Sequence, residues 1–165
     1  AFCAQASCSV IGKSADELTA ELAELGAELL VRTLPGIADG SAEWTEQEEA
    51  LVTHAAKISK AELRLDPADD ALVNARRVLA SSDTAPARCE IAGRPVRVTR
   101  ARNGAPVRDQ PAQERFAIEG KHLFLGCADG ALEVASLKPD GKRDMDAAAW
   151  VAGQRERTGA WAKLA

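Results

Sequence analysis

The first forty residues carry the apolar spacing of an amphipathic helix. Four leucines recur at intervals of four and three residues, the period of one helix face: Leu18, Leu22, Leu25 and Leu29. Ser14 and Glu17 form a capping box directly before them, and Pro35-Gly36 interrupts the pattern afterwards. We therefore expect a helix over about residues 15–34. Because one helix cannot bury its own apolar face, the stripe needs a partner in this chain, a second copy or another protein.

The following segment predicts a linker and then a second helix. Residues 39–50 are acidic and rich in turn-forming residues, which is typical of a linker, and Trp44 is expected to anchor it to a surface. Asp66-Pro67 indicates a helix start, because Asp is a good N-cap and Pro suits the first helical position. This helix should run to about residue 80. Its expected buried stripe is Leu72, Ala75, Val78 and Leu79.

From residue 88 onward the apolar period becomes two, which is typical of β-strands. The alternating pairs are Val96 and Val98, Leu123 and Leu125, and Leu132 and Val134. Two dipeptides mark turns: Asn103-Gly104 and Asp129-Gly130. Short strands with tight turns within about 60 residues predict a small antiparallel β-barrel. Asp144 or Asp146 should cap a last helix that carries Met145 and Trp150, so the expected fold class is α+β.

Composition excludes some classes of protein and of site. The chain has 165 residues, of which 46% are hydrophobic and 28% charged, and no apolar run approaches the roughly 20 residues of a membrane span. Four cysteines match no zinc-binding pattern: Cys3, Cys8, Cys89 and Cys127. We therefore expect free thiols, no metal site, and a reducing compartment such as the cytoplasm or the mitochondrial matrix.

Basic residues are concentrated in the second part of the chain. Residues 1–66 hold 5 Lys/Arg against 12 Asp/Glu, whereas residues 67–165 hold 16 against 13. Six arginines lie within residues 88–108, where Glu90 is the only acid, and a basic pair follows the last predicted strand. Arginine forks match phosphate geometry, and the scarcity of aromatic residues favours structured RNA over single strands. The predicted RNA contacts are Arg88, Arg94, Arg97, Arg100, Arg102, Lys142 and Arg143, with Arg108 nearby. A solvated strand face is the alternative.

Five segments, in the right order, resemble the methionyl-tRNA formyltransferase family. Residues 22–30 resemble the last helix of that family's catalytic domain, and residues 51–66 resemble the segment that joins its two domains. Residues 93–98 resemble its first barrel hairpin. Residues 129–134 and 137–145 resemble the last barrel strand and the turn after it. The resemblance covers nearly the whole chain.

This resemblance implies a domain organisation. It implies a remnant of the catalytic domain at residues 1–40, a linker at 41–66, and an OB-like C-terminal β-barrel with flanking helices at 67–165. In the family, a catalytic domain transfers a formyl group from 10-formyltetrahydrofolate with an Asn, a His and an Asp, and the barrel holds initiator tRNA. The chain looks like the back half of such an enzyme, so we expect no catalytic residue and no cofactor in it.

Three departures from the family pattern stand out. His54 lies in the linker and His122 in a barrel strand, and neither matches the catalytic histidine. Residues 84–89 lack the aromatic residue and the glycine of the family motif before the first strand. Residues 106–113 lack the usual Pro-Gly turn, so the barrel is expected to be trimmed there.

Three functions remain open at this point. The leading hypothesis is a non-catalytic part of a methionyl-tRNA formyltransferase that contacts tRNA or other structured RNA, with the leucine helix docking on the catalytic domain or another protein. The second is a formyltransferase-derived structural subunit of a larger assembly, mitochondrial or ribosomal. The third is the C-terminal part of a sugar or amino-acid formyltransferase, whose barrel need not bind RNA. Phosphate-based binding should weaken steeply with salt, whereas docking through the leucines should not.

Overall fold

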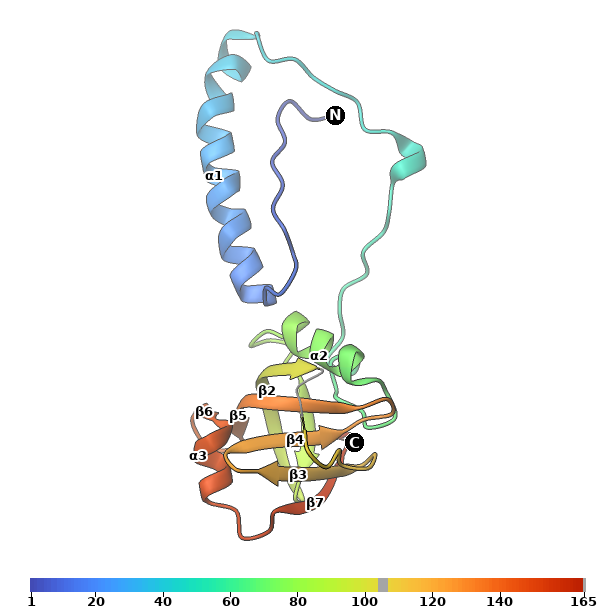
Figure 1. Ribbon diagram of the computed structural model, residues 1–165. Helices are drawn as coiled ribbons and strands as arrows, with labels where there is room; N and C mark the ends of the chain where they lie inside the picture. The colour runs from blue at the N-terminus through green and yellow to red at the C-terminus, as the bar shows by residue number, and fades with distance from the viewer. Residues whose placement is uncertain (104–106, 165) are drawn as a thin grey trace. The chain divides into compact units, whose positions relative to one another are not determined.

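The computed structural model describes residues 1–103 and 107–164 and divides the chain into two compact units, Ala1–Lys57 and Ile58–Ala165. Unit 1 contains α1 (Ala15–Asp39) and the short 3-10 helix η1 (Glu49–Leu51), as Figure 1 shows. Unit 2 contains two helices, α2 (Ala71–Ala80) and α3 (Ala147–Ala152). Its strands are β1 (Arg88–Ile91), β2 (Arg94–Asn103), β3 (Arg115–Glu119), β4 (His122–Gly126), β5 (Ala131–Pro139), β6 (Met145–Asp146) and β7 (Thr158–Ala162).

The predicted first helix is present as α1, but its predicted end is wrong. Both hydrogen bonds of the capping box form: the Glu17 N–H donates to Ser14 Oγ at 3.2 Å, and the Ser14 N–H donates to Glu17 Oε2 at 2.8 Å. The helix continues through Pro35 to Asp39. A proline inside a helix removes one N–H donor, which bends a helix more readily than it ends one. The end comes at Gly40, whose φ of 78° favours glycine.

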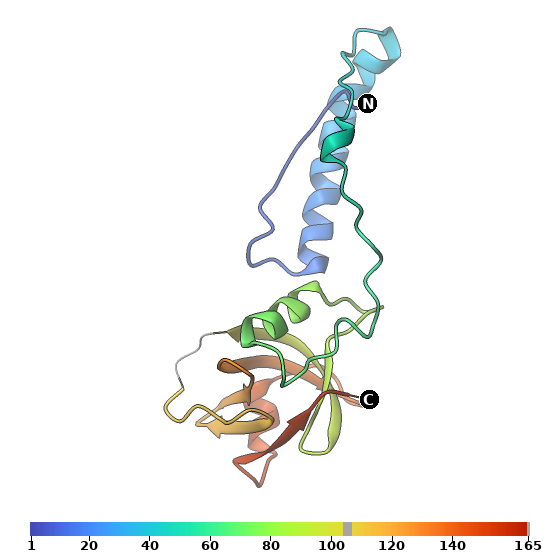
Figure 2. The same ribbon diagram turned by 90° about the vertical axis from the view of Figure 1, so that its right-hand side faces the viewer.

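Unit 1 buries little of its apolar surface. None of residues 1–57 is buried, although the segment before α1 runs beside that helix (Figure 2). Among the four predicted leucines, Leu22 is 48% exposed and the other three are half-buried. The further exposed apolar side chains of α1 are Leu30, Val31, Leu34 and Ile37. Trp44 remains 60% exposed, so the expected anchor of the linker is only partly covered.

The strands of unit 2 form the predicted closed antiparallel barrel. Each strand pairs with the next in the order β2-β1-β7-β3-β4-β5, and β2 also pairs with β5, which completes a ring of six; β6 adds to β5. The Asp129-Gly130 turn joins β4 to β5 as expected. The Asn103-Gly104 turn and the start of the 106–113 segment lie outside the described residues. Strand β7 has no counterpart among the predicted strands, yet it links β1 to β3 and completes the barrel.

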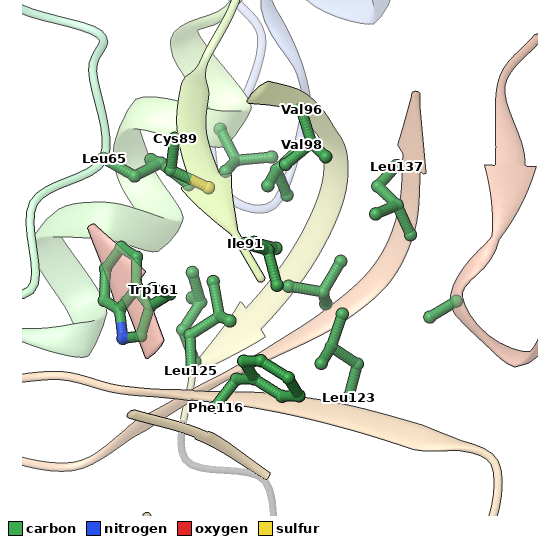
Figure 3. Packing of buried hydrophobic residues seen from close by; sticks show 14 of the residues in the cluster. Leu65, Cys89, Ile91, Val96, Val98, Phe116, Leu123, Leu125, Leu137 and Trp161 are labelled. Carbon is green, nitrogen blue, oxygen red and sulfur yellow. The ribbon is translucent and has the colours of Figure 1, made fainter. Parts of the chain in front are cut away.

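Alternate strand residues fill the inside of the barrel. Phe116, Leu123, Leu125 and Trp161 point into one shared core (Figure 3), and Trp161 Nε1–H donates to the Gly126 carbonyl at 2.8 Å. Leu65 joins this core from the segment before α2 and is fully buried. The same alternation turns the intervening residues to the outer face, where the candidate site lies.

The predicted start and buried stripe of α2 need correction. Asp66 accepts a hydrogen bond from the Ala68 N–H at 2.9 Å, which forms a local turn, and α2 begins only at Ala71. Leu72 is 41% exposed, because the helix packs on β2 and β5 through Ala71, Asn74, Ala75 and Val78. Asn74 is buried because its amide pairs with the backbone of residue 66, accepting at 3.0 Å and donating at 2.8 Å.

The last helix is shorter than predicted. Asp146 is the N-cap of α3, and Trp150 is buried in it as expected. Met145 is not helical, because it pairs with Leu137 as part of β6.

Candidate nucleic-acid interface

Four basic residues lie in register across four neighbouring segments of unit 2. Arg88 of β1 pairs with Arg97 of β2, and Arg97 pairs with Lys138 of β5. Arg64 extends the series through a bridge to Arg88, where the Leu65 N–H donates to the Arg88 carbonyl at 2.9 Å. Neighbouring strands lie about 4.8 Å apart, so the four residues span about 14 Å. We name Arg64, Arg88, Arg97 and Lys138 the cation row.

Strand alternation directs this row toward solvent. Three members of the row are each flanked in sequence by buried residues, which lie on the opposite side of the strand. The buried flanking residues are Leu63 and Leu65 around Arg64, Ala87 and Cys89 around Arg88, and Val96 and Val98 around Arg97. Core packing therefore fixes the backbone beneath the row, and the basic side chains share one outer face.

Two aspartates from neighbouring loops pair with the two central arginines. Arg97 Nη1 donates to Asp83 Oδ1 at 2.6 Å, and Arg88 Nη2 donates to both Asp140 oxygens at 2.7 and 2.5 Å. The hydrogen bond from Arg97 and its positive charge lower the pKa of Asp83. The side chain of Asp83 is 93% exposed and that of Asp140 is 57% exposed. We name these two residues the row aspartates.

The aspartates leave part of the row unpaired. Within the described residues, no carboxylate forms an ion pair with Arg64 or Lys138. The Nε atoms of Arg88 and Arg97 are buried and have no hydrogen-bond acceptor. Buried Nε atoms cannot meet a ligand, so the donors open to one are those of Arg64 and Lys138 and the terminal nitrogens of Arg88 and Arg97. With four cations beside two aspartates, the face has a net positive charge, which suits an anionic ligand with several charges.

The structure does not gather all seven predicted RNA contacts in one place. Arg88 and Arg97 lie in the row, and the exposed Lys142 and Arg143 follow Asp140 in the turn after β5. Arg100 and Arg102 are exposed farther along β2, and five residues of strand place Arg102 about 16 Å from Arg97.

Two of the remaining basic residues have other surroundings. Arg94 lies at the β1–β2 turn and lines a hollow of about 430 Å³ with Phe116, Gln154 and Arg155. Opposite Arg102 on β5 stands Glu133, whose carboxylate pairs with His122 Nδ1 at 2.7 Å. The sequence-based set therefore contains a central cluster and separate basic residues around it.

Two members of the row were not among the predicted contacts. Arg64 falls within the predicted linker, although Leu63-Arg64-Leu65 has the alternation of a strand. Lys138 follows the same alternation at the end of β5. Register across strands brings both beside Arg88 and Arg97, and register is not visible in a single stretch of sequence.

The two histidines lie in different units, and neither belongs to the cation row. His54 is exposed in unit 1, and His122 is 63% exposed and paired with Glu133 on the barrel. Among the described residues, no group of three or more His, Cys, Asp and Glu side chains could hold a metal ion. No helix in residues 1–103 and 107–164 has the length and apolarity to cross a membrane.

Unit 1 offers a different kind of surface. Apolar side chains of α1, of residues 2–4 and of Trp44 line a hollow of about 300 Å³. Its lining includes Phe2, Leu29, Leu30, Ile37 and Trp44. Only apolar contacts are available along most of this hollow, in contrast to the charged outer face of the barrel.

Comparison with known proteins identifies relatives of the chain. The family described as "Formyl transferase, C-terminal domain" matches residues 57–155. Methionyl-tRNA formyltransferase of Methylococcus capsulatus is 38% identical over 145 residues, which cover 86% of this chain and 46% of that protein. The enzyme of Rhodopseudomonas palustris is 38% identical over 136 residues, covering 81% and 43%. The chain thus spans about half the length of these relatives.

Solved structures support the same fold. A variant of HypX from Aquifex aeolicus aligns with a TM-score of 0.63 and 21% identity, covering 86% of this chain and 26% of HypX. At this identity the likeness concerns the fold alone. The closed barrel, the family match over residues 57–155 and the relatives above agree. The chain therefore belongs to the formyltransferase family, carries its C-terminal domain and is related to the methionyl-tRNA formyltransferases.

Proposed function

We propose that this chain is the non-catalytic C-terminal part of a methionyl-tRNA formyltransferase-like protein, and that its cation row binds the phosphates of initiator tRNA or another structured RNA. The observation that carries the proposal is the row itself, with four cations in register on one outer face. A row of about 14 Å can meet several phosphates of a folded RNA at once. Phosphate contacts alone can position a folded RNA on the row, without any reading of its bases.

The proposal is tested by RNA binding of the full chain at several salt concentrations. The variant Arg64→Gln with Lys138→Gln removes the two cations that have no carboxylate partner, so it leaves both existing ion pairs intact. We expect it to bind a tRNA transcript about tenfold more weakly and to reduce the slope of log K against log salt by about two, one for each lost phosphate contact. Fluorescence anisotropy between 50 and 200 mM salt (roughly the range in which phosphate binding varies most) measures both quantities.

A matched control separates the row from net charge. Arg115 is exposed on β3, which pairs with β4 and β7 and not with any strand of the row. Arg115→Gln removes one positive charge away from the row, so it should weaken binding less than Arg64→Gln alone or Lys138→Gln alone. If the row variant binds the transcript as tightly as the unchanged chain, the row is not the RNA site.

We further propose that residues 1–40 are the end of a catalytic domain, and that the apolar face of α1 docks on the remainder of that domain. The observation in favour is that none of residues 1–57 is buried, although Leu30, Leu34 and Ile37 follow one another at helical spacing. The relatives contain about half of their length beyond the matched region. The test is whether the N-terminal half of a relative protects α1 from proteolysis.

A further inference from the structure

The row aspartates occupy places that an anionic ligand would take. Asp83 and Asp140 come from different loops, yet each ends on a guanidinium of the row. Each is bound through its side chain to one arginine only, so the contacts are those of surface ion pairs. Such pairs are weak in water, because solvent screens the charges and competes for the donors.

A bound phosphate and a row aspartate exclude each other. Each aspartate takes one terminal nitrogen, Nη1 of Arg97 or Nη2 of Arg88, and a phosphate oxygen would accept from the same nitrogen while carrying the larger charge. If the carboxylate stayed in place beside the phosphate, the two anions would repel each other at contact distance. Because Asp83 is 93% exposed, its side chain can turn into solvent without opening any core contact.

We propose that Asp83 and Asp140 are specificity-determining residues. Their ion pairs with Arg97 and Arg88 compete with single small anions, and only a polyanion that makes several contacts displaces them. This inference rests on the proposed RNA-binding function of the row. A single phosphate gains contact with one arginine but must displace one aspartate, so its net binding free energy is small. An RNA backbone also reaches Arg64 and Lys138, which form no ion pair within the described residues, and the free energy of these added contacts offsets the loss of the aspartate pairs.

Electroneutral substitutions test the inference in the full chain. We expect Asp83→Asn to tighten binding of a tRNA transcript about threefold, and the same for Asp140→Asn, because the competing carboxylate is gone. The control is Glu114→Gln, which removes the same charge just before β3, off the strands of the row. Its effect should be clearly smaller than that of either aspartate.

A double-mutant cycle shows whether the effect passes through the paired arginine. In the Arg97→Gln background Asp83 has lost its hydrogen-bonded partner and only the weaker attraction of Lys138 remains, so the gain from Asp83→Asn should fall to nearly that of Glu114→Gln. An equal gain from Asp83→Asn with and without Arg97 would overturn the inference.

Competition by inorganic phosphate is the second readout. At constant ionic strength, with each protein at the concentration that half-saturates the transcript, phosphate should displace the transcript from the Asp83→Asn, Asp140→Asn double variant at about threefold lower concentration than from the unchanged chain. Equal competition in both proteins would overturn the inference. If the Arg64→Gln, Lys138→Gln variant still binds normally, the proposed function fails; if that variant is weakened but the aspartate variants match the Glu114 control, only this inference fails.

Discussion

The four thiols of this chain differ in their surroundings, and their chemistry should differ accordingly. All four cysteines are free; Cys3 and Cys8 are half-exposed in unit 1, whereas Cys89 and Cys127 are buried in the barrel. Burial raises the pKa of the Cys127 thiol to about 11, although the Asn74 amide beside its sulfur acts in the opposite direction. Burial also raises the pKa of Cys89, with a smaller contribution from nearby Cys127.

This contrast predicts two classes of thiol reactivity. Since thiolate is the reactive form, a raised pKa slows alkylation at neutral pH, and burial blocks access as well. In the native chain at about pH 8, we expect iodoacetamide to label Cys3 and Cys8 first, and Cys89 and Cys127 only through unfolding. Mass spectrometry of peptides over time measures the four rates. Four similar rates before denaturant is added would contradict the burial of the second pair.

The sequence reveals individual side-chain contacts only in part. Arg88 and Arg97 were predicted as anion-binding residues because arginines are dense in that stretch, and the structure places them side by side. The pairing with Asp83 and Asp140 was not predictable, because these acids lie 14 residues from Arg97 and 52 residues from Arg88. Closure of the barrel brings such residues together, and no local pattern encodes that distance.

A close approach of two backbone segments controls how β4 packs. A Cβ added to Gly126 would lie 2.0 Å from the Ala112 carbonyl oxygen and 2.6 Å from that of Pro111. Both are backbone atoms, so the segment before β3 would have to move away from β4. That segment is tied down locally, because the Glu114 N–H donates to the Gly126 carbonyl at 3.3 Å.

Gly126→Ala should therefore destabilise the barrel by about 3 kcal/mol, the upper range for an overpacked interior. Gly130→Ala is the matched control in the same hairpin, since its added Cβ would meet only the flexible end of Gln110 at 3.3 Å. The control should change the free energy of unfolding by less than about 0.5 kcal/mol. Urea unfolding of both variants measures the difference. Equal midpoints would show that the segment before β3 moves away from β4 without loss of stability.

Periodicity predicted those elements whose pattern is long. α1 and the alternating strands β2, β4 and β5 are of this kind, and they suffice for the α+β class and the barrel. Periodicity does not predict the shorter elements. Strand β7 has only five residues with one buried aromatic, Trp161, and it is defined by its pairing with β1 and β3. The start of α2 was misplaced because Asp66 makes a turn with the same chemistry as a helix cap.

The two units differ in what holds them together. Every buried residue lies in residues 63–161 of the described chain, and the shared core belongs to unit 2. Unit 1 has the capping box, the Lys13–Glu21 ion pair and the bridge between Phe2 and Thr45, but no buried side chain. Helical stability depends mostly on packing of an apolar face, so α1 should open far more easily than the barrel.

Limited trypsin digestion tests this difference in stability between the two units, because trypsin sites lie in the exposed stretch between α1 and the barrel. Lys57 and Lys60 lie in the stretch 43–62, where every residue is exposed, whereas Arg64 is fixed by the bridge to Arg88. We expect early cleavage after Lys57 or Lys60 and a resistant fragment that begins at Ile58 or Ala61, since proteases cut open, exposed chain first. Mass spectrometry identifies the fragment. Cuts within the barrel at the same rate would show that unit 2 is no more stable than unit 1.

The same digestion tests the proposed docking of α1. When the separately produced N-terminal half of the Methylococcus capsulatus relative is added, its contact with Leu30, Leu34 and Ile37 should slow cleavage after Arg32 several-fold. The linker sites should stay open, because they lie outside the proposed contact. Replacing Leu30 and Leu34 by Gln should abolish this protection and leave the barrel fragment unchanged, since neither side chain is buried in the chain itself. Protection that persists in this variant would place the partner on another surface of the chain.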